Sequence, residues 1–152
     1  MSLSIRPFDK YKDKQFVDGL FSQYNWDPFP KKSTPKTGRI VSFNGKDIAA
    51  GFMFFTDVNV AIIGYIIADR NEKSEVRREA ASYIIEDLTD YAKIKGNEII
   101  YTYTNHSSLI DIYKGCGYKS LQQNIQTLAY TTTEEYDFLT EEQHEDTSNR
   151  SR

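Results

Sequence analysis

The sequence predicts a single α/β domain (α+β in the mixed sense), with a central mixed sheet of about six strands and helices on both faces. Three observations support this fold class. A length of 152 residues suits one domain with one core. A hydrophobic content of 39%, with 14% aromatic residues, supplies a packed interior. Strand-like and helix-like apolar patterns also alternate, with three consecutive strands followed by a helical crossover, an order typical of a mixed sheet.

The N-terminal part begins with a short strand over Leu3–Phe8. A helix is expected over Lys10–Tyr24, because its apolar residues recur at spacings of three and four. The stretch Asn25–Gly38 contains three prolines and three lysines, which predicts a basic loop without regular structure.

A β-hairpin is expected next. Two strand-like runs, Arg39–Phe43 and Asp47–Phe55, flank Asn44-Gly45, a dipeptide that tolerates the positive φ angles of a tight hairpin turn. The following run, Val60–Ala68, is apolar at nearly every position, which is typical of a central strand buried on both faces.

The C-terminal part begins with a long amphipathic helix over Glu75–Lys95, for which Ser74 can cap the start and Gly96 can form the end. The remaining expected elements are a strand over Glu98–Thr104, a short helix over Ser107–Lys114 stopped by Gly115 and Gly117, and a final strand over Leu121–Tyr130.

Charge divides the chain into a domain, residues 1–130, and an acidic tail, residues 131–152, that we expect to be flexible. The tail holds seven acids and two bases. An overall pI near 5.4 argues against nucleic acid as the main partner.

No apolar run approaches the roughly 18 residues of a membrane span, and the N-terminus lacks the apolar stretch of a signal peptide. The lone Cys116 excludes a disulfide framework and a Cys-rich zinc site, so we expect a cytoplasmic protein.

Short motifs at the end of the domain have a family-like spacing. Ala-Lys-x-x-Gly precedes a predicted strand, Thr-x-Thr-Asn follows it, and Tyr-x-x-x-Gly-Tyr closes the last helix. The residues concerned are Ala92, Lys93, Gly96, Thr102, Thr104, Asn105, Tyr113, Gly117 and Tyr118. Over residues 3–130 this order resembles the GNAT superfamily of acyl-CoA-dependent N-acetyltransferases, and a GNAT-like fold is therefore expected.

The resemblance is closest to small, divergent members encoded by tailed bacteriophages, whose location would be the host cytoplasm. Those members combine an Asn-Trp loop, an Ile-Ala-Ala-Gly-Phe strand and an Arg-x-x-Ala helix start. The corresponding residues here are Asn25-Trp26, Ile48–Phe52 and Arg77–Ala80.

The resemblance implies acetyl-CoA as co-substrate, without a metal. It places acyl-CoA between the strands Val60–Ala68 and Glu98–Thr104, with the pyrophosphate at the N-terminus of the helix that begins at Glu75. The cofactor-binding residues it implies are Ile66, Ile67, Arg77, Arg78, Ala80, Ala81, Ser82 and Asn105.

The predicted helix start is unusually basic. Arg70, Lys73, Arg77 and Arg78 lie near it, although acids are the stabilising choice in a first turn. A bound phosphate would explain these bases, and a solvated charged helix start is the alternative. The family pattern also places two small residues, one of them always glycine, in this turn. If the family pattern is aligned so that it starts at Arg77, its two small positions are Ala80 and Ser82. Neither this alignment nor the one that starts at Val76 contains a glycine.

In this family a tyrosine protonates the departing thiolate, and Tyr113 matches it by its spacing from Gly117-Tyr118. Tyr113 can equally be a core residue of an amphipathic helix. Asn105 matches an asparagine that contacts the pantetheine arm, and it can also cap the short helix. No general base is evident, since Asp57 and Asp69 fit turns and His106 fits a surface loop.

The acceptor pocket is expected to involve the loop Asn25–Gly38, with Trp26 and Phe29 as its walls or as plugs of the core. The acceptor would be a small-molecule amine or a protein, and the loop lysines favour an acidic one. Family members often form homodimers. Three interpretations follow: an active N-acyltransferase; a GNAT-fold protein with a degenerate CoA site that acts as a non-catalytic virion or host-modulating binding protein; or an unrelated small α/β ligand-binding domain.

Overall fold

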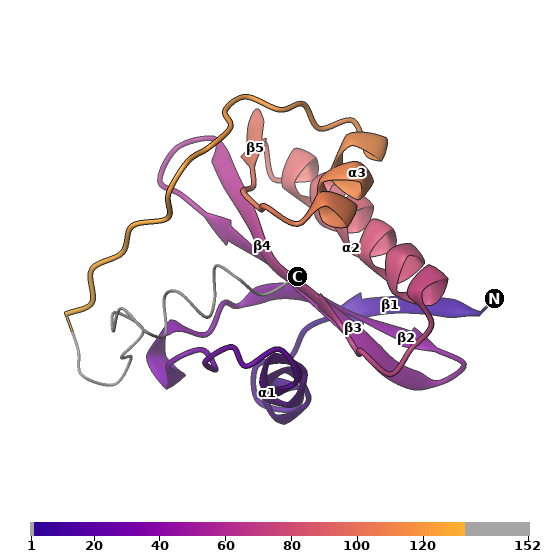
Figure 1. Ribbon diagram of the computed structural model, residues 1–152. Helices are drawn as coiled ribbons and strands as arrows, with labels where there is room; N and C mark the ends of the chain where they lie inside the picture. Colours follow the sequence, from indigo (N-terminus) through magenta and orange to yellow (C-terminus); the bar gives the residue numbers. More distant parts are fainter. Residues whose placement is uncertain (1, 133–152) are drawn as a thin grey trace.

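The computed structural model describes residues 2–132 as a five-stranded mixed sheet between two helical layers (Figure 1). The strands are β1 (Leu3–Pro7), β2 (Thr37–Phe43), β3 (Lys46–Phe55), β4 (Val60–Ala68) and β5 (Ile99–Tyr101). They lie in the order β1-β2-β3-β4-β5, antiparallel from β1 to β4, and β5 is parallel to β4. The helices are α1 (Lys14–Gln23), α2 (Ser74–Ile94) and α3 (Ser107–Gly115), with a 3₁₀ turn, η1, over Lys31–Ser33.

The turns follow the expected chemistry. Asn44 and Gly45 both have positive φ, 51° and 86°, as the tight turn between β2 and β3 requires. Gly96, with φ 89°, follows the end of α2, and its N–H donates to the carbonyl of Lys93. The hairpin and the helix end are therefore confirmed.

Each face of the sheet has its own core. Under α2 and α3 the buried residues include Ile63, Ile84 and Leu88, and under α1 they include Phe21, Ile40 and Phe52. Figure 1 shows α1 on one side of the sheet and both other helices on the opposite side. β4 contributes Ile63 to one core and Ile67 to the other, which confirms that it is buried on both faces.

Several local predictions are wrong. The stretch Asn25–Gly38 is not without regular structure, because it contains the 3₁₀ turn η1 and the first two residues of β2. Leu121–Tyr130 is not a strand, and the sheet has five strands rather than about six. Asn124, with φ 57°, interrupts the extended backbone, and among the described residues no neighbouring strand pairs with this segment. Ser74 also does not cap α2, because it is the first helical residue and Lys73 occupies the cap position. The domain boundary and the acidic tail cannot be compared, since residues 133–152 lie outside the described part of the chain.

Candidate active site

The sheet opens between β4 and β5. These strands pair only from Val60–Ile99 to Ile62–Tyr101, while β4 continues to Ala68. After Tyr101 the chain leaves the sheet and turns into α3. Beyond Ile62 this edge of β4 therefore has no partner strand in the described part of the chain. We call the region beside this unpaired edge the wedge, and it is where the resemblance predicts acyl-CoA.

A β-bulge redirects β4 at this wedge. Ala50 pairs with Ile67 and Phe52 with Gly64, so Gly51 of β3 faces two residues, Tyr65 and Ile66. Tyr65 has a φ of 57°, in the left-handed region, and its half-exposed ring turns toward the α1 face. Its centroid lies 5.8 Å from that of Phe21 and 4.8 Å from that of Phe29.

Gly51 permits this arrangement because it leaves room for α2. A Cβ at Gly51 would lie 2.5 Å from Ile66 Cδ1 and 2.5 Å from Ile84 Cγ2. The glycine therefore allows α2 to approach the bulged strand closely. Sequence reasoning missed Tyr65, and the only signal was a Gly-Tyr pair within an otherwise apolar strand.

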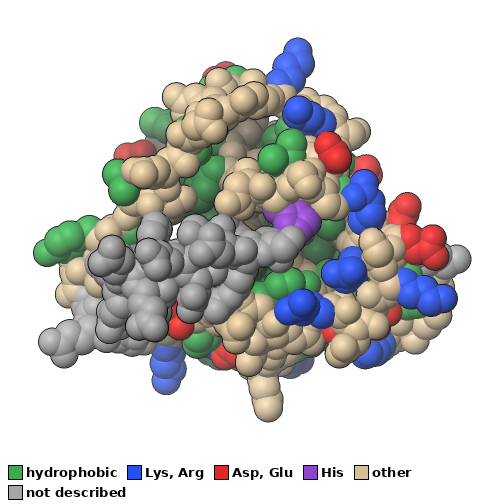
Figure 2. Space-filling model, viewed as in Figure 1, with side chains coloured by type: hydrophobic (Ala, Val, Ile, Leu, Met, Phe, Trp, Pro, Cys, Tyr) green, Lys and Arg blue, Asp and Glu red, His purple; other side chains and the backbone are tan. Residues whose placement is uncertain are grey.

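The start of α2 has the features of an anion site. No side chain caps it, so the first-turn N–H groups of Ser74, Glu75 and Val76 have no capping acceptor. The Arg77 Nε atom is buried and has no hydrogen-bond partner. Arg78 Nη1 donates to Ser108 Oγ at 2.6 Å, which ties the start of α2 to the first turn of α3. Figure 2 shows Lys and Arg side chains gathered over this side of the molecule.

Neighbouring charges are already engaged elsewhere. Arg70 donates to the Gln23 carbonyl at 3.1 Å and lies over the Tyr24 ring, so its guanidinium is held at the end of α1 rather than at α2. Lys46 Nζ lies 3.3 Å from Glu72 Oε2, which partly neutralises that acid. Asp69 accepts from the N–H of Asn71 at 2.9 Å, which fits the turn role expected for it.

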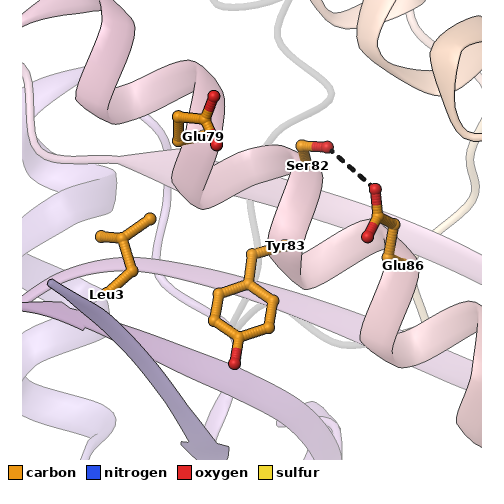
Figure 3. Close-up of a pocket in the computed structure, with 5 residues that line it drawn as sticks. All are labelled: Leu3, Glu79, Ser82, Tyr83 and Glu86. Atoms are coloured by element: carbon orange, nitrogen blue, oxygen red, sulfur yellow. Dashed lines mark hydrogen bonds between the residues drawn. The ribbon is translucent and has the colours of Figure 1, made fainter. Parts of the chain in front are cut away.

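Further along α2, the residues predicted to bind the cofactor lie in different environments, some in the core and some on the surface. Ala80 is fully buried in the core between α2 and the sheet, and Ala81 is also buried. Ser82 lies eight residues after Ser74, about 12 Å along the helix axis, and donates to Glu86 at 3.3 Å. Ser82 and Glu86 also line a hollow of about 190 Å³, together with Glu79, Tyr83 and, from β1, Leu3. Figure 3 shows these five side chains and the Ser82–Glu86 hydrogen bond. Two carboxylates line this hollow, so it is unsuited to phosphate.

Tyr113 lies in the core beneath α3, and only 4% of it is exposed. Thr102, just after β5, donates its hydroxyl to Tyr113 Oη at 3.2 Å, and the Tyr118 ring packs edge-on against it. Burial raises the pKa of the Tyr113 phenol far above its usual range, despite the opposing effect of the Thr102 hydrogen bond. The phenol is thus protonated at neutral pH and positioned by the end of β5.

His106, rather than Asn105, caps α3. The Leu109 N–H donates to His106 Nδ1 at 3.3 Å, and the His106 N–H donates to Thr104 Oγ1 at 3.2 Å. Asn105 is exposed on the turn between β5 and the helix. The helix-capping role considered for Asn105 is therefore filled by His106.

Trp26 and Phe29 pack around Tyr65. The ring of Phe29 is buried between Phe52 and Tyr65, while Trp26 is half-buried with its centroid 6.3 Å from that of Tyr65. The loop after α1 therefore folds onto the bulge of β4. Ile66 and Ile67 follow Tyr65 and face opposite cores, so they can meet a ligand in the wedge only through their backbone or the half-buried Ile66 side chain.

Solved structures with the same architecture cover most of the chain. An aminoglycoside acetyltransferase from an uncultured soil metagenomic sample superimposes with a TM-score of 0.66 at 14% identity, over 86% of this chain and 97% of that one. A glucosamine-6-phosphate N-acetyltransferase from Arabidopsis thaliana gives a TM-score of 0.62 at 16% identity, over 86% and 99%. The chain has a GNAT-like fold.

This similarity establishes the fold and leaves the activity open. A structure titled as a transcriptional regulator from Bacillus halodurans matches equally well, with a TM-score of 0.63 at 12% identity over 84% of this chain and 100% of that one. No protein-family model matches the chain, and no curated protein sequence matches it significantly. Among residues 2–132, no helix combines the length and apolar character needed to cross a membrane.

Proposed function

We propose that the protein is an N-acyltransferase that transfers an acetyl group from acetyl-CoA to an amine of a small molecule or a protein. The start of α2 carries this proposal. First-turn N–H groups without a side-chain cap, together with the buried, partnerless Arg77 Nε, offer hydrogen-bond donors and positive charge to a pyrophosphate. The Arg78–Ser108 hydrogen bond sets α3 beside the same helix end.

The missing glycines do not obstruct this site. A side chain interferes with a bound phosphate only where it points at the phosphate, and the Ala80 side chain is fully buried against the sheet. In the proposal, the phosphates meet the N–H groups of residues 74–76 and the guanidinium of Arg77, with Arg78 beside them. Asn105 and the backbone of Ile66 and Ile67 face the pantetheine portion. Ala81 and Ser82 support the helix without contacting phosphate.

Tyr113 supplies the proton in the proposed reaction. Acetyl-CoA provides a thioester carbonyl that an acceptor amine attacks, and the departing thiolate needs a proton. Because Tyr113 Oη accepts from Thr102, its own proton is left to be donated to a different acceptor. Its raised pKa keeps that proton in place until the thiolate forms. The C–N bond forms as the C–S bond breaks, and the proton that the amine nitrogen loses passes to solvent, because the proposal assigns no general base.

The acceptor amine would lie over the aromatic cluster of Trp26, Phe29 and Tyr65. The exposed part of Tyr65 gives this cluster an accessible apolar surface at the bulge, next to the wedge. The nearby Lys31, Lys32 and Lys36 are exposed and favour an acidic acceptor. Acetylation rates for acidic and cationic amines test this preference, and faster acetylation of polyamines would rule it out.

A second function has specific support. The buried Ala80, the deeply buried Tyr113 and the lack of an assigned base are also what a GNAT-fold binding protein without catalysis would show. In this alternative the protein acts by binding a partner, as a virion component or a modulator of a host. The bacteriophage origin and the cytoplasmic location stay predictions from the sequence.

Thermal unfolding with acetyl-CoA and with desulfo-CoA separates the two functions. A ligand at about 100 times its Kd should add roughly 2.7 kcal/mol to the free energy of unfolding. Stabilisation by both ligands, followed by acetylation of at least one amine in a panel, supports the transferase. Stabilisation without turnover of any amine favours the binding protein, and no stabilisation by either ligand contradicts the proposed site.

A further inference from the structure

The residue that caps α3 is a histidine. The Leu109 N–H donates to His106 Nδ1 at 3.3 Å, and the Ile110 N–H donates to the His106 carbonyl at 3.0 Å. A ring nitrogen accepts a hydrogen bond only while it carries no proton, so this cap requires the neutral imidazole with its proton on Nε2. The usual capping residues keep an acceptor oxygen at neutral pH, whereas histidine titrates between about pH 5 and pH 8. The start of α3 therefore depends on the protonation state of His106.

The turn that His106 caps is also tied to the proposed acetyl-CoA site. Ser108 lies in this turn and accepts from Arg78 Nη1 at 2.6 Å, which fixes the Arg78 guanidinium. Figure 1 shows α3 beside α2, and the two helices are in contact. The same helix carries Tyr113, and it is only 9 residues long. Because a helix this short is not stable alone, its conformation depends on its cap and its packing.

The charges around the cap oppose a cation on His106. α3 packs chiefly against α2, and Arg78 of α2 reaches this end of α3 through Ser108. Glu86 of α2 lies toward the other end of α3. The first turn of α3 contains no acid, and Asp111 comes after it. The helix dipole also disfavours a cation at a helix N-terminus. Protonation of His106 therefore removes the cap and adds an unfavourable charge.

We propose that His106 is a positioning residue that makes the acetyl-CoA site depend on pH. With a neutral His106, the capped turn keeps Ser108 on Arg78 and holds the helix that carries Tyr113. With a protonated His106, the Leu109 N–H loses its acceptor, the first turn loosens and Arg78 loses its anchor, so acetyl-CoA binds more weakly. The effect on acetyl-CoA rests on the proposed function, whereas the effect on α3 does not.

The direction of the pH effect follows from the acceptor nitrogen. The cap is intact on the alkaline side of the histidine titration and is lost as the pH falls through it. Loss of an N-cap usually changes the equilibrium of a helix by about two- to thirtyfold. Because only part of this change reaches Arg78, the Kd of CoA should rise at least about threefold between about pH 7.5 and pH 5.5.

Two substitutions at this position separate the cap from its titration. His106→Asn supplies an amide oxygen that accepts the same hydrogen bond and does not titrate, so it should keep the cap at both pH values. His106→Ala removes the cap at both. His144→Asn, which replaces the other histidine of the chain, is the matched control and should behave like the wild type.

Hydrogen exchange of the Leu109 amide, divided by its intrinsic rate at each pH, reports the cap without any ligand. In the wild type and in His144→Asn, this protection should fall at least about threefold between about pH 7.5 and pH 5.5. It should stay constant in His106→Asn and low throughout in His106→Ala. Calorimetry then measures the CoA affinity, whose loss at the lower pH should be at least about threefold greater in the wild type than in His106→Asn. This comparison cancels the titration of the CoA phosphates.

Three results would overturn the positioning role. The first is an equal pH dependence of Leu109 protection in the wild type and in His106→Asn, the variant that carries the test if His106→Ala does not fold. The second is a cap that titrates while the CoA affinities of these two proteins keep a constant ratio. The third is a folded wild type that binds no CoA at either pH. That result contradicts the proposed acetyl-CoA site as well, and Leu109 protection then still decides whether the cap titrates.

Discussion

Replacing Gly51 by alanine should destabilise the domain substantially. The new Cβ would lie 2.5 Å from both Ile66 Cδ1 and Ile84 Cγ2, where carbon atoms normally stay about 3.5–4.0 Å apart. Ile84 is fully buried between α2 and the sheet, so the strain must be relieved by moving α2 or the bulged strand. Overpacking of this kind costs about 1–3 kcal/mol, and two simultaneous contacts place Gly51→Ala at about 2–3 kcal/mol.

Thermal and chemical unfolding monitored by circular dichroism measure this cost. At about 2–4 °C per kcal/mol for a chain of this size, Tm should fall by about 4–12 °C. Gly19→Ala is the matched control. Gly19 lies in α1 with no atom within 4 Å of an added Cβ, so the same change should raise stability by about 0.5–1 kcal/mol.

A second substitution identifies the clash itself. Ile66→Val removes Cδ1, one of the two obstructing atoms, so Gly51→Ala should cost less in that background than in the wild type. If Gly51→Ala proves neutral or as stabilising as Gly19→Ala, the close approach of α2 to the bulge is refuted.

Three further predictions concern single side chains. Arg77→Ala should lower CoA affinity at least about tenfold in calorimetry while Lys93→Ala, at the far end of α2, leaves it unchanged; equal affinities would contradict the phosphate role. Tyr113→Phe should lower the acetylation rate with little change in CoA affinity, and should cost about 0.5–1.5 kcal/mol of stability for the lost Thr102 hydrogen bond; an unchanged rate would leave Tyr113 as a core residue only. Hydrogen bonds from Arg6 lower the pKa of Asp13 below its usual value of 3.8. The pair therefore stabilises the folded protein fully above pH 3.8, and this stabilisation is lost as the pH falls through the lowered pKa of the folded state. Asp13→Asn should weaken the loss of unfolding free energy at acidic pH, and an unchanged pH dependence would refute the assignment.

The sequence predicted local structure correctly where the residue types at a position determine the backbone conformation. Asn44-Gly45 predicts its hairpin because both positions need positive φ, and Gly96 ends α2 for the same reason. The apolar run Val60–Ala68 predicts a central strand because no other environment satisfies apolar side chains on both faces.

The sequence did not predict features that depend on contacts with residues far away in the chain. The bulge at Tyr65 requires a mismatch with β3. Arg70 contacts Gln23, the last residue of α1, and Tyr24 just after it, rather than the start of α2. Leu121–Tyr130 has the composition of a strand, but composition specifies neither a neighbour nor the left-handed turn at Asn124.

The site was partly predictable. Two arginines on successive positions marked the start of α2, and the structure brings both there. The sequence did not show that the two arginines have different roles, because the Arg78–Ser108 hydrogen bond forms only when α3 packs beside α2. The capping of α3 by His106 rather than Asn105 likewise depends on the turn after β5.

Amide chemical shifts during a CoA titration test the central claim most directly. The account predicts saturable shifts of the backbone N–H groups of Ser74, Glu75 and Val76 and of the Arg77 Nε–H, with much smaller changes when pantetheine, which lacks the pyrophosphate, replaces CoA. Unchanged resonances at these four sites in the folded protein, or equal responses to both compounds, would contradict it.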